Sequence, residues 1–526
     1  MKKLKVFVAM FFLVPCFSIA LVAQVKTVEV TGGAIEGVVN SGIASFKGIP
    51  FAAPPIGDLR WKAPQPVIPW KEVKRTVAFG ATPIQDKKMS RLLAQNPTMS
   101  EDCLYLNVWT GAKDTHEKLP VMVWIYGGGF AAGSTSTPIY DGTTFAKNGV
   151  VFVSIAYRVG AMGFLAHPDL SKESTKGSGC YGIQDQVAAL KWVKENIAKF
   201  GGNPDNVTIF GQSAGSFSCS ILSAVPAAKG LFHRIIAQSG AYMEPLRYGN
   251  EAGQYSVSLK LAEETGKEFL SKLGADNIDA ARALNADEIQ NAIPSLPIFK
   301  FWPVADGVTI PGDLYEQYLD GKFNDVPVII GSNSDEGGSF VPLEQALKPN
   351  GFVKKIRDGY GPAAEGILKV YPHVTDLETF KSEKDIWRET LFAWPAWAWA
   401  NLHTKKSKNK TYVYYFDVHN DKSKDGAIHS AEICYVLGFP YGINGGKPSA
   451  NDKYVMNLMN SYWINFAKNG DPNGPGLPVW PTYDQKKRKT MIFDDATGVR
   501  PLPNVDKYKA FDDYYAWRRK QNRERK

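Results

Sequence analysis

The residues best suited to chemistry lie in the segment VTIFGQSAGS, where an apolar run at 207–210 leads into the pentapeptide GQSAG around Ser213. In a G-x-S-x-G turn between a strand and a helix, the serine hydroxyl is exposed at the edge of the sheet and can act as a nucleophile. Apolar residues at 221–222 fit the helix that such a turn requires. The pattern predicts Ser213 as a nucleophile for acyl transfer, against the alternative of an ordinary loop serine.

Three consecutive glycines follow another apolar run, in VMVWIYGGGF, at residues 127–129. Backbone N–H groups without neighbouring Cβ atoms can converge on one oxygen, as an oxyanion hole requires. The alternative is a dinucleotide-binding loop, because Gly127, Gly129 and Ala132 loosely match that fingerprint. The next apolar run ends in Tyr157, where a ribose-binding acid is expected, so the segment favours an oxyanion hole.

A serine nucleophile of this type is followed along the chain by an acid and then by a histidine. The histidines after Ser213 are His233, His373, His403, His419 and His429. His429, in GAIHSAEICYVLG, lies in a loop between apolar segments and is the best candidate for the base, whereas His403 and His419 are expected to be solvated. For the acid, GSNSDEGGSF offers Asp335 and Glu336 after an apolar run, and the residues alone leave that choice open.

The segments that must position these residues alternate between strand and helix patterns. Apolar, β-branched runs predict buried strands at residues 121–126, 150–157, 207–210, 234–238 and 326–331. Runs that are apolar on both faces are typical of a parallel sheet covered by helices. Apolar residues spaced by three to four positions at 183–200 predict an amphipathic helix. The fold class is therefore α/β, with a large, mostly parallel sheet flanked by helices in a single domain.

The composition describes a globular chain of 526 residues, 44% hydrophobic and 21% charged, and excludes wholesale disorder. The formal net charge of +9 lies mostly in residues 1–23 and in the tail 518–526, so the body between them is nearly neutral. A neutral body argues against nucleic-acid binding, which needs a basic face. We expect the basic tail to be a solvated end.

Residues 1–23 read KKLK and then an apolar run, as in a secretory signal peptide. An uncleaved membrane anchor is the alternative, but no second long apolar run follows, so we expect no stable membrane insertion. Residues 24–526 then form one exported domain, secreted or periplasmic. In an oxidising compartment, its cysteines either pair in one of three complete ways or remain buried thiols: Cys103, Cys180, Cys219 and Cys434.

The chain resembles the type-B carboxylesterase family, which includes the cholinesterases, as a bacterial-type secreted member. The blocks that carry the resemblance include FKGIPFAAPPIGDLRWKAPQP, SEDCLYLNVW, PVMVWIYGGGF, VTIFGQSAGS, GSNSDEGGSF and GAIHSAEICYVLGFP, in this order. The resemblance implies an α/β-hydrolase fold that needs no metal or cofactor, and it selects Glu336 over Asp335. It implies a triad of Ser213, Glu336 and His429, with an oxyanion hole formed by the N–H groups of Gly128, Gly129 and Ala214.

Three departures from the family pattern are visible. Gln212 stands where members usually have Glu, so one charge beside the nucleophile is missing. The cysteine that closes a loop with the equivalent of Cys103 in cholinesterases has no counterpart after the signal peptide. No Trp lies between Trp70 and Trp109, where cholinesterases carry the ring that stacks on choline. By these residues the chain is not a cholinesterase.

Aromatic residues outside the triad are candidates for the substrate pocket. Phe299, Phe301 and Trp302 resemble the stretch that shapes the acyl pocket of the family. Trp394 and Trp397 either line the gorge or pack in the core. Aromatic walls favour uncharged esters. We interpret the chain as a serine carboxylesterase for neutral esters; the alternatives are an esterase for aryl, feruloyl, polyester or fatty-acyl substrates, and a catalytically silent adhesion protein on the same scaffold.

Overall fold

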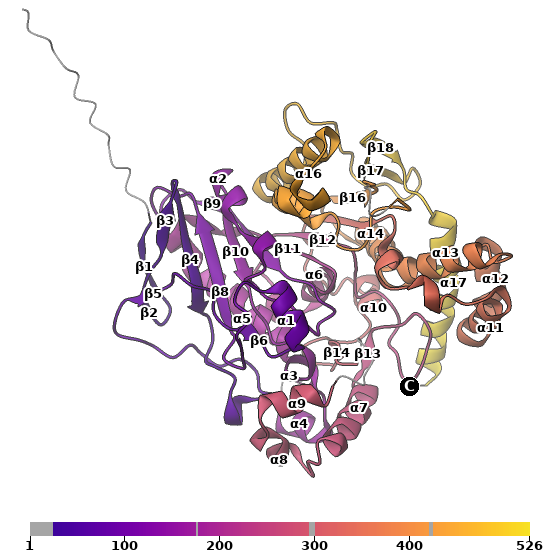
Figure 1. Cartoon of the computed structure of the whole chain (residues 1–526), viewed down its shortest axis with the longest axis horizontal. Coiled ribbons are helices and arrows are strands. Elements are labelled where there is room, and N and C mark those ends of the chain that lie inside the picture. The colour runs from indigo at the N-terminus through magenta and orange to yellow at the C-terminus, as the bar shows by residue number, and fades with distance from the viewer. Residues whose placement is uncertain (1–24, 175–176, 294–299, 420–423, 526) are drawn as a thin grey trace, which may run out of the picture.

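A computed structural model describes residues 25–174, 177–293, 300–419 and 424–525. It is built around an 11-stranded sheet that crosses the molecule from the N-terminal strands to β18 (Figure 1). In sheet order the strands are β18 (Gly498–Pro501), β17 (Lys489–Phe493), β16 (Thr411–Phe416), β15 (Val328–Asn333), β12 (Arg234–Gln238), β11 (Gly202–Gln212), β9 (Leu119–Ile125), β10 (Val151–Ile155), β8 (Tyr105–Thr110), β4 (Ile43–Pro50) and β3 (Val38–Asn40). Neighbours from β17 to β10 are parallel, and the strands outside them are antiparallel.

The predicted strands are confirmed as the parallel centre of this sheet, and the run at 234–238 matches β12 in both bounds. The antiparallel strands have weaker sequence signals because polar residues interrupt them. In β8, for example, Asn107 is fully buried, and both the oxygen and the nitrogen of its side-chain amide are hydrogen-bonded. Its amide oxygen accepts the N–H of Gly48 at 2.9 Å, and its amide nitrogen donates to Ser154 Oγ at 2.9 Å.

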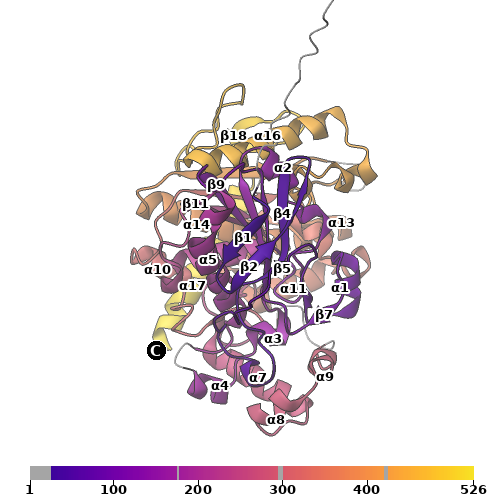
Figure 2. The ribbon, with the colours of Figure 1, turned by 90° about the vertical axis from the view of Figure 1, so that its left-hand side faces the viewer.

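Helices cover the sheet and extend beyond it at the top and bottom of both views, with α16 at the top and α8 at the bottom (Figures 1 and 2). The predicted helix at 183–200 is α5 (Tyr181–Asn196) followed by a 3₁₀ turn. The other helices are α1 (Lys87–Leu93), α2 (Thr143–Lys147), α3 (Gly160–Phe164), α4 (Pro168–Glu173), α6 (Ala214–Ala224), α7 (Leu259–Lys272), α8 (Ile278–Ala283), α9 (Ala286–Asn291), α10 (Leu314–Leu319), α11 (Pro349–Tyr360), α12 (Ala364–Val370), α13 (Asp376–Trp387), α14 (Trp394–Lys406), α15 (Ile433–Leu437), α16 (Ala450–Asn469) and α17 (Val505–Glu524). A π-helical turn, Arg388–Ala393, joins α13 to α14.

Short strands form three small sheets beside the main one. They are β1 (Thr27–Val30), β2 (Gly33–Glu36) and β5 (Lys74–Arg75), then β6 (Thr82–Pro83) with β7 (Met99–Ser100), and β13 (Val257–Ser258) with β14 (Val304–Ala305). None of the helices in the described ranges combines the length and apolar character needed to cross a membrane.

The first residues of the basic C-terminal segment belong to the docked helix α17, so the expectation of a solvated tail is wrong for Arg518 and Arg519, whereas Arg523 and Arg525 are exposed. Arg518 pairs with Glu251 at 2.6 Å, and Arg519 pairs with Asp313 at 3.0 Å. Both guanidinium side chains are at most 10% exposed. The sequence shows the charge of this segment but not the acidic residues that face it, which lie more than 200 positions away. The excess charge of the tail is therefore partly neutralised inside the molecule.

The cysteines of the described ranges are free thiols, and Cys103, Cys180 and Cys219 are buried. Burial raises the pKa of the Cys103 thiol, because the thiolate loses its hydration. The Cys180 thiol donates to the carbonyl oxygen of Val304 at 2.9 Å. Of the alternatives left open by the sequence, the structure supports buried thiols over disulfide pairing.

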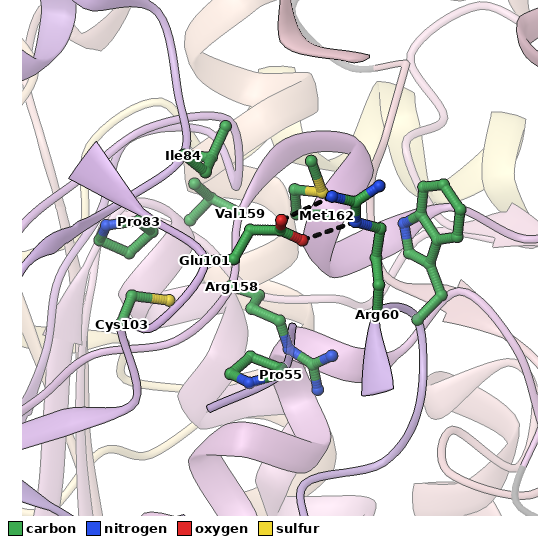
Figure 3. A pocket seen from close by; sticks show the side chains of 10 residues that line it. Pro55, Arg60, Pro83, Ile84, Glu101, Cys103, Arg158, Val159 and Met162 are labelled. Carbon is green, nitrogen blue, oxygen red and sulfur yellow. Dashed lines mark hydrogen bonds and ion pairs between the residues drawn. The ribbon is translucent and has the colours of Figure 1, made fainter. Parts of the chain in front are cut away.

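A buried ion pair ties the N-terminal segment to the core. Arg60 and Glu101 point toward each other and make two hydrogen bonds of 2.6 Å (Figure 3). The same guanidinium donates to the carbonyl oxygens of Arg282 and Leu284 at the end of α8. The space beside the pair is only about 10 Å³, which is too small for a substrate. This arrangement is structural.

We expect Glu101→Gln to lower the free energy of unfolding by about 3 kcal/mol, because it leaves the Arg60 guanidinium buried without its counter-charge. Urea denaturation at neutral pH measures the change. Glu36→Gln is the matched control, since Glu36 is paired with Lys26 at the surface, where ion pairs contribute little. Equal effects of the two substitutions would contradict the structural role of the buried pair.

Candidate active site

Ser213 lies at the sharp turn between β11 and α6. Its backbone has φ 57° and ψ −124°, a conformation that non-glycine residues rarely adopt. The N–H of Ser213 donates to the carbonyl oxygen of Gln238 at 2.9 Å, which fixes the turn to the end of β12. The strand, sharp turn and helix that the sequence predicts around Ser213 are therefore present, and the serine is held in a strained backbone conformation at the N-terminus of α6.

Close packing explains two glycines around this turn. A Cβ on Gly215 would lie 1.9 Å from the carbonyl oxygen of Ile125, so α6 can approach β9 only with glycine there. A Cβ on Gly127 would lie 2.9 Å from the Cβ of Ser213. The glycine loop after β9 therefore lies directly against the serine turn, and Gly128 (φ 122°) and Gly129 (φ 61°) continue it.

The candidate base and acid meet by a short hydrogen bond. Nδ1 of His429 and Oε2 of Glu336 are 2.6 Å apart, and Glu336 is fully buried. Oε1 of Glu336 accepts the backbone N–H of Asn333 at 2.8 Å. The carboxylate thus has a partner on each oxygen, and the imidazole is oriented with Nε2 directed away from Glu336.

The loops that carry these two residues are bonded to each other. The backbone N–H of Asp335 donates to the carbonyl oxygen of Ala427 at 2.9 Å. The amide nitrogen of Asn333 donates to the carbonyl oxygen of Ile428 at 2.9 Å. Since these bonds lie beside Glu336 and His429 in the chain, they fix the distance between the acid and the base.

The carboxylate of Asp335, the residue before Glu336, pairs with a lysine and not with His429. Asp335 Oδ2 is 3.2 Å from Nζ of Lys384, which also pairs with Asp425 at 3.2 Å. Burial raises the pKa of Asp335, and the Lys384 ammonium opposes that shift. The geometry therefore brings Glu336, and not Asp335, to His429.

Aromatic rings enclose the imidazole. The ring of Phe392 stacks on His429 with centroids 4.3 Å apart and 29° between the planes, and Phe340 lies 5.3 Å away. Phe392 belongs to the π-helical turn between α13 and α14. Such turns shift the register of a helix by one residue, and here the turn directs a ring onto the base.

Nε2 of His429, the imidazole nitrogen that Glu336 does not contact, has a hydrogen-bond partner that the sequence did not reveal. The amide nitrogen of Gln212 lies 3.3 Å from it. Gln212 is 2% exposed, so this contact is shielded from water.

Sequence reasoning also missed a polar cluster behind the base. Glu432 is fully buried. Its carboxylate accepts hydrogen bonds from the amide nitrogens of Asn333, at 2.7 Å, and Gln238, at 3.4 Å. Burial, followed by the charge of Glu336, raises the pKa of Glu432 to about 7. A carboxylate three positions after His429, in HSAE, is the signal that could have indicated it.

Of the predicted pocket residues, Trp302 is the one placed beside the site elements. Its ring lies 5.2 Å from Phe130, which follows the glycine loop, and 5.2 Å from Phe217, on the first turns of α6. Phe301 packs instead against Phe269 of α7, with centroids 5.0 Å apart. Phe299 lies outside the described residues.

The other two predicted pocket residues contact the C-terminal helix. Trp394 donates its indole N–H to Asp512 at 2.9 Å and packs on Tyr515 with centroids 4.1 Å apart. Trp397 packs on Tyr508 at 5.8 Å. These contacts favour the core-packing alternative over a gorge wall.

Among the other histidines, the expectation that His403 is solvated is wrong. It is fully buried, with Nδ1 bonded to Thr411 at 2.8 Å and Nε2 bonded to the carbonyl oxygen of Val326 at 2.9 Å. Burial lowers its pKa to about 4. His419 is 48% exposed in its side chain, as expected.

The chain is similar to known proteins over most of its length. The model of the carboxylesterase family matches residues 24–510. The chain is 34% identical to the para-nitrobenzyl esterase of Bacillus subtilis (strain 168) over 494 residues, which cover 90% of this chain and 96% of that protein. It is 34% identical to the fumonisin B1 esterase of Sphingopyxis macrogoltabida, with 89% of this chain and 86% of that protein covered.

Solved structures show the same fold. A structure of PNB esterase superimposes with a TM-score of 0.82 at 32% identity, covering 93% of this chain and 99% of that one. The carboxylesterase of Geobacillus stearothermophilus gives a TM-score of 0.80 at 33% identity, with 92% and 99% covered. The chain therefore belongs to the carboxylesterase family and is a carboxylic ester hydrolase with an α/β-hydrolase fold.

Proposed function

We propose that the protein is a serine carboxylesterase that hydrolyses neutral esters through Ser213, His429 and Glu336. The observation that carries the proposal is the buried hydrogen bond of 2.6 Å between His429 and Glu336. It leaves Nε2 as the only imidazole nitrogen available to a substrate or to a nucleophile. The strained turn at Ser213 adjoins Gln212, whose amide touches that nitrogen.

The acylation step follows from these positions. Nε2 of His429 takes the proton of the Ser213 hydroxyl while Oγ forms a bond to the ester carbonyl carbon. The N–H groups of Gly128, Gly129 and Ala214 stabilise the oxyanion, since the glycine loop and the start of α6 meet at the serine. Glu336 stabilises the imidazolium, which then gives its proton to the departing alcohol. Water repeats the sequence on the acyl-enzyme and releases the acid.

Neutral substrates are supported by a neighbouring cavity that aromatic rings connect to the site. A cavity of about 490 Å³ is lined by Tyr255 and Trp387. Tyr255 packs on Trp302 at 5.9 Å, and Trp387 stacks on Phe340, the neighbour of His429. The charged residues of its lining are Lys355, Glu383 and Asp358. Lys355 pairs with Glu383 at 3.1 Å, and Asp358 pairs with Lys354 outside the lining. An aromatic wall whose charged residues are each paired suits uncharged esters.

Esterases for aryl, feruloyl, polyester or fatty-acyl esters remain alternatives within this class. The scaffold also suits a catalytically silent adhesion protein, which would not need the bonded acid and base beside a strained serine. On the basis of its N-terminal sequence, we further propose that the protein is exported as a single domain of residues 24–526. The signal peptide itself, residues 1–23, lies outside the described ranges.

Ser213→Ala should leave the fold intact and lower kcat by about 10⁴–10⁶-fold, because no other group replaces the nucleophile. Hydrolysis of a p-nitrophenyl ester measures the loss, and circular dichroism checks the fold. A fluorescent phosphonate should label wild-type protein at Ser213 and leave the variant unlabelled. A variant that retains a tenth of the wild-type turnover would disprove the assignment.

Glu336→Gln should lower kcat by several orders of magnitude, since the imidazole loses both its orienting acceptor and its counter-charge. Asp335→Asn is the matched control, because Asp335 pairs with Lys384 and not with His429. We expect its kcat to stay within about tenfold of wild type. The reverse ranking in the same ester assay would assign the acid to Asp335.

A third prediction concerns charge selectivity. The isostere of butyrylcholine with carbon in place of the ammonium nitrogen should be hydrolysed at least as efficiently as the choline ester. The reason is that no choline-stacking Trp lies between Trp70 and Trp109, and each cation–π contact contributes about 0.5–2 kcal/mol. The values of kcat/KM at equal ionic strength decide the question. A tenfold preference for the charged ester would contradict the proposal of neutral substrates.

A further inference from the structure

Gln212 occupies an unusual position for a neutral residue. It is the last residue of β11, next to the nucleophile, and its amide nitrogen contacts the nitrogen of His429 that must act as the base. On the other side, a Cβ placed on Gly127 would lie 3.3 Å from Oε1 of Gln212. The glycine loop therefore leaves room for the carboxamide, and the side chain bridges the loop and the base.

The direction of the hydrogen bond follows from the tautomer. Glu336 accepts from Nδ1, so Nδ1 carries the proton and Nε2 of a neutral imidazole has only its lone pair. An amide N–H can donate to that lone pair, whereas a protonated Nε2 would face the amide oxygen instead. The orientation with the nitrogen toward His429 therefore matches an unprotonated Nε2.

We propose that Gln212 is a positioning residue that donates its amide N–H to Nε2 of His429 and keeps the base unprotonated until the Ser213 hydroxyl replaces the amide. The amide and the hydroxyl are both donors to a single lone pair, so they occupy it in turn. An amide cannot give up its proton at this site, and so it holds the base without neutralising it. This inference rests on the proposed role of His429.

Charged and titratable groups from several elements surround the imidazole and the loop that carries Glu336. Glu336 is bonded to it, and Glu432 of the segment before α15 is coupled to both of them. Tyr414 of β16 is buried near the two carboxylates. From the π-helical turn, Arg388 donates to the carbonyl oxygen of Ser334 and pairs with Glu389. Asp335 and Lys384 neutralise each other beside the acid loop.

Replacement of Gln212 should change the protonation equilibrium of Nε2 of His429 in a predictable direction. A carboxylate in Gln212→Glu would accept a hydrogen bond from protonated Nε2 and would favour the imidazolium. Opposite charges at this distance shift protonation by about 1–3 pH units. Gln212→Met keeps the approximate shape, adds no charge and removes the donor, so the neutral base loses one hydrogen bond and the shift is smaller.

The test is the pH at which kcat/KM for a neutral p-nitrophenyl ester reaches half its plateau on the acid side. We expect this midpoint to be lowest in wild type, higher by a few tenths of a pH unit in Gln212→Met and higher by at least about one unit in Gln212→Glu. Gln485→Glu, which adds the same charge at an exposed position, is the control and should not move the midpoint. Any other order of wild type, Met and Glu variants overturns the proposal.

A second readout separates this inference from the proposed activity. NMR titration of the His429 ring in the Ser213→Ala background follows protonation without any turnover. In this background, proteins with Gln, Met or Glu at position 212 should show the same order of titration midpoints as in the kinetic test. If wild type hydrolyses no ester but the NMR order holds, the proposed ester hydrolysis fails, whereas the hydrogen bond from Gln212 to unprotonated Nε2 of His429 stands. If turnover is normal and the NMR midpoints coincide, the role of Gln212 fails alone.

Discussion

The hydrogen bond between His429 and Glu336 joins two loops that are 93 residues apart. Such a contact is possible because β15 and β16, which precede the loops, are parallel neighbours in the sheet. The carboxyl ends of parallel strands lie at one edge, and β11 and β12 end at that edge beside them. Strand order therefore places Glu336, His429 and Ser213 at one edge of the sheet, and the bonds between the loops set the distance between Glu336 and His429.

A buried carboxylate and a strained serine are both costly, and the same parallel sheet supports them. Glu336 is fully buried, yet each of its oxygens accepts a hydrogen bond, which offsets the lost hydration. At Ser213 the unfavourable φ is retained because the turn is bonded to β12 and packed through Gly215 against β9. Rigid strands on both sides leave the turn no alternative conformation.

The sequence predicts those features that are encoded locally. The strand at 234–238 and the elbow around Ser213 follow from short patterns of apolar and small residues, and both are present. The choice between Asp335 and Glu336 could not be made locally, because adjacent carboxylates differ only in the neighbour that the fold gives each one. The docking of Arg518 on Glu251 has the same cause, as it depends on a partner distant in the chain.

The polarity around the base shows why a neutral residue at position 212 suits this chain. Burial already raises the pKa of Glu432 to about 7, with the charge of Glu336 as the next cause, so the site resists further negative charge. A third carboxylate would stabilise the imidazolium before substrate binds as well as in the transition state, and uniform stabilisation does not accelerate the reaction. An amide donor favours the free base instead. When the Ser213 hydroxyl replaces the Gln212 amide at Nε2 of His429, one hydrogen-bond donor exchanges for another. The net loss of hydrogen bonding is therefore small.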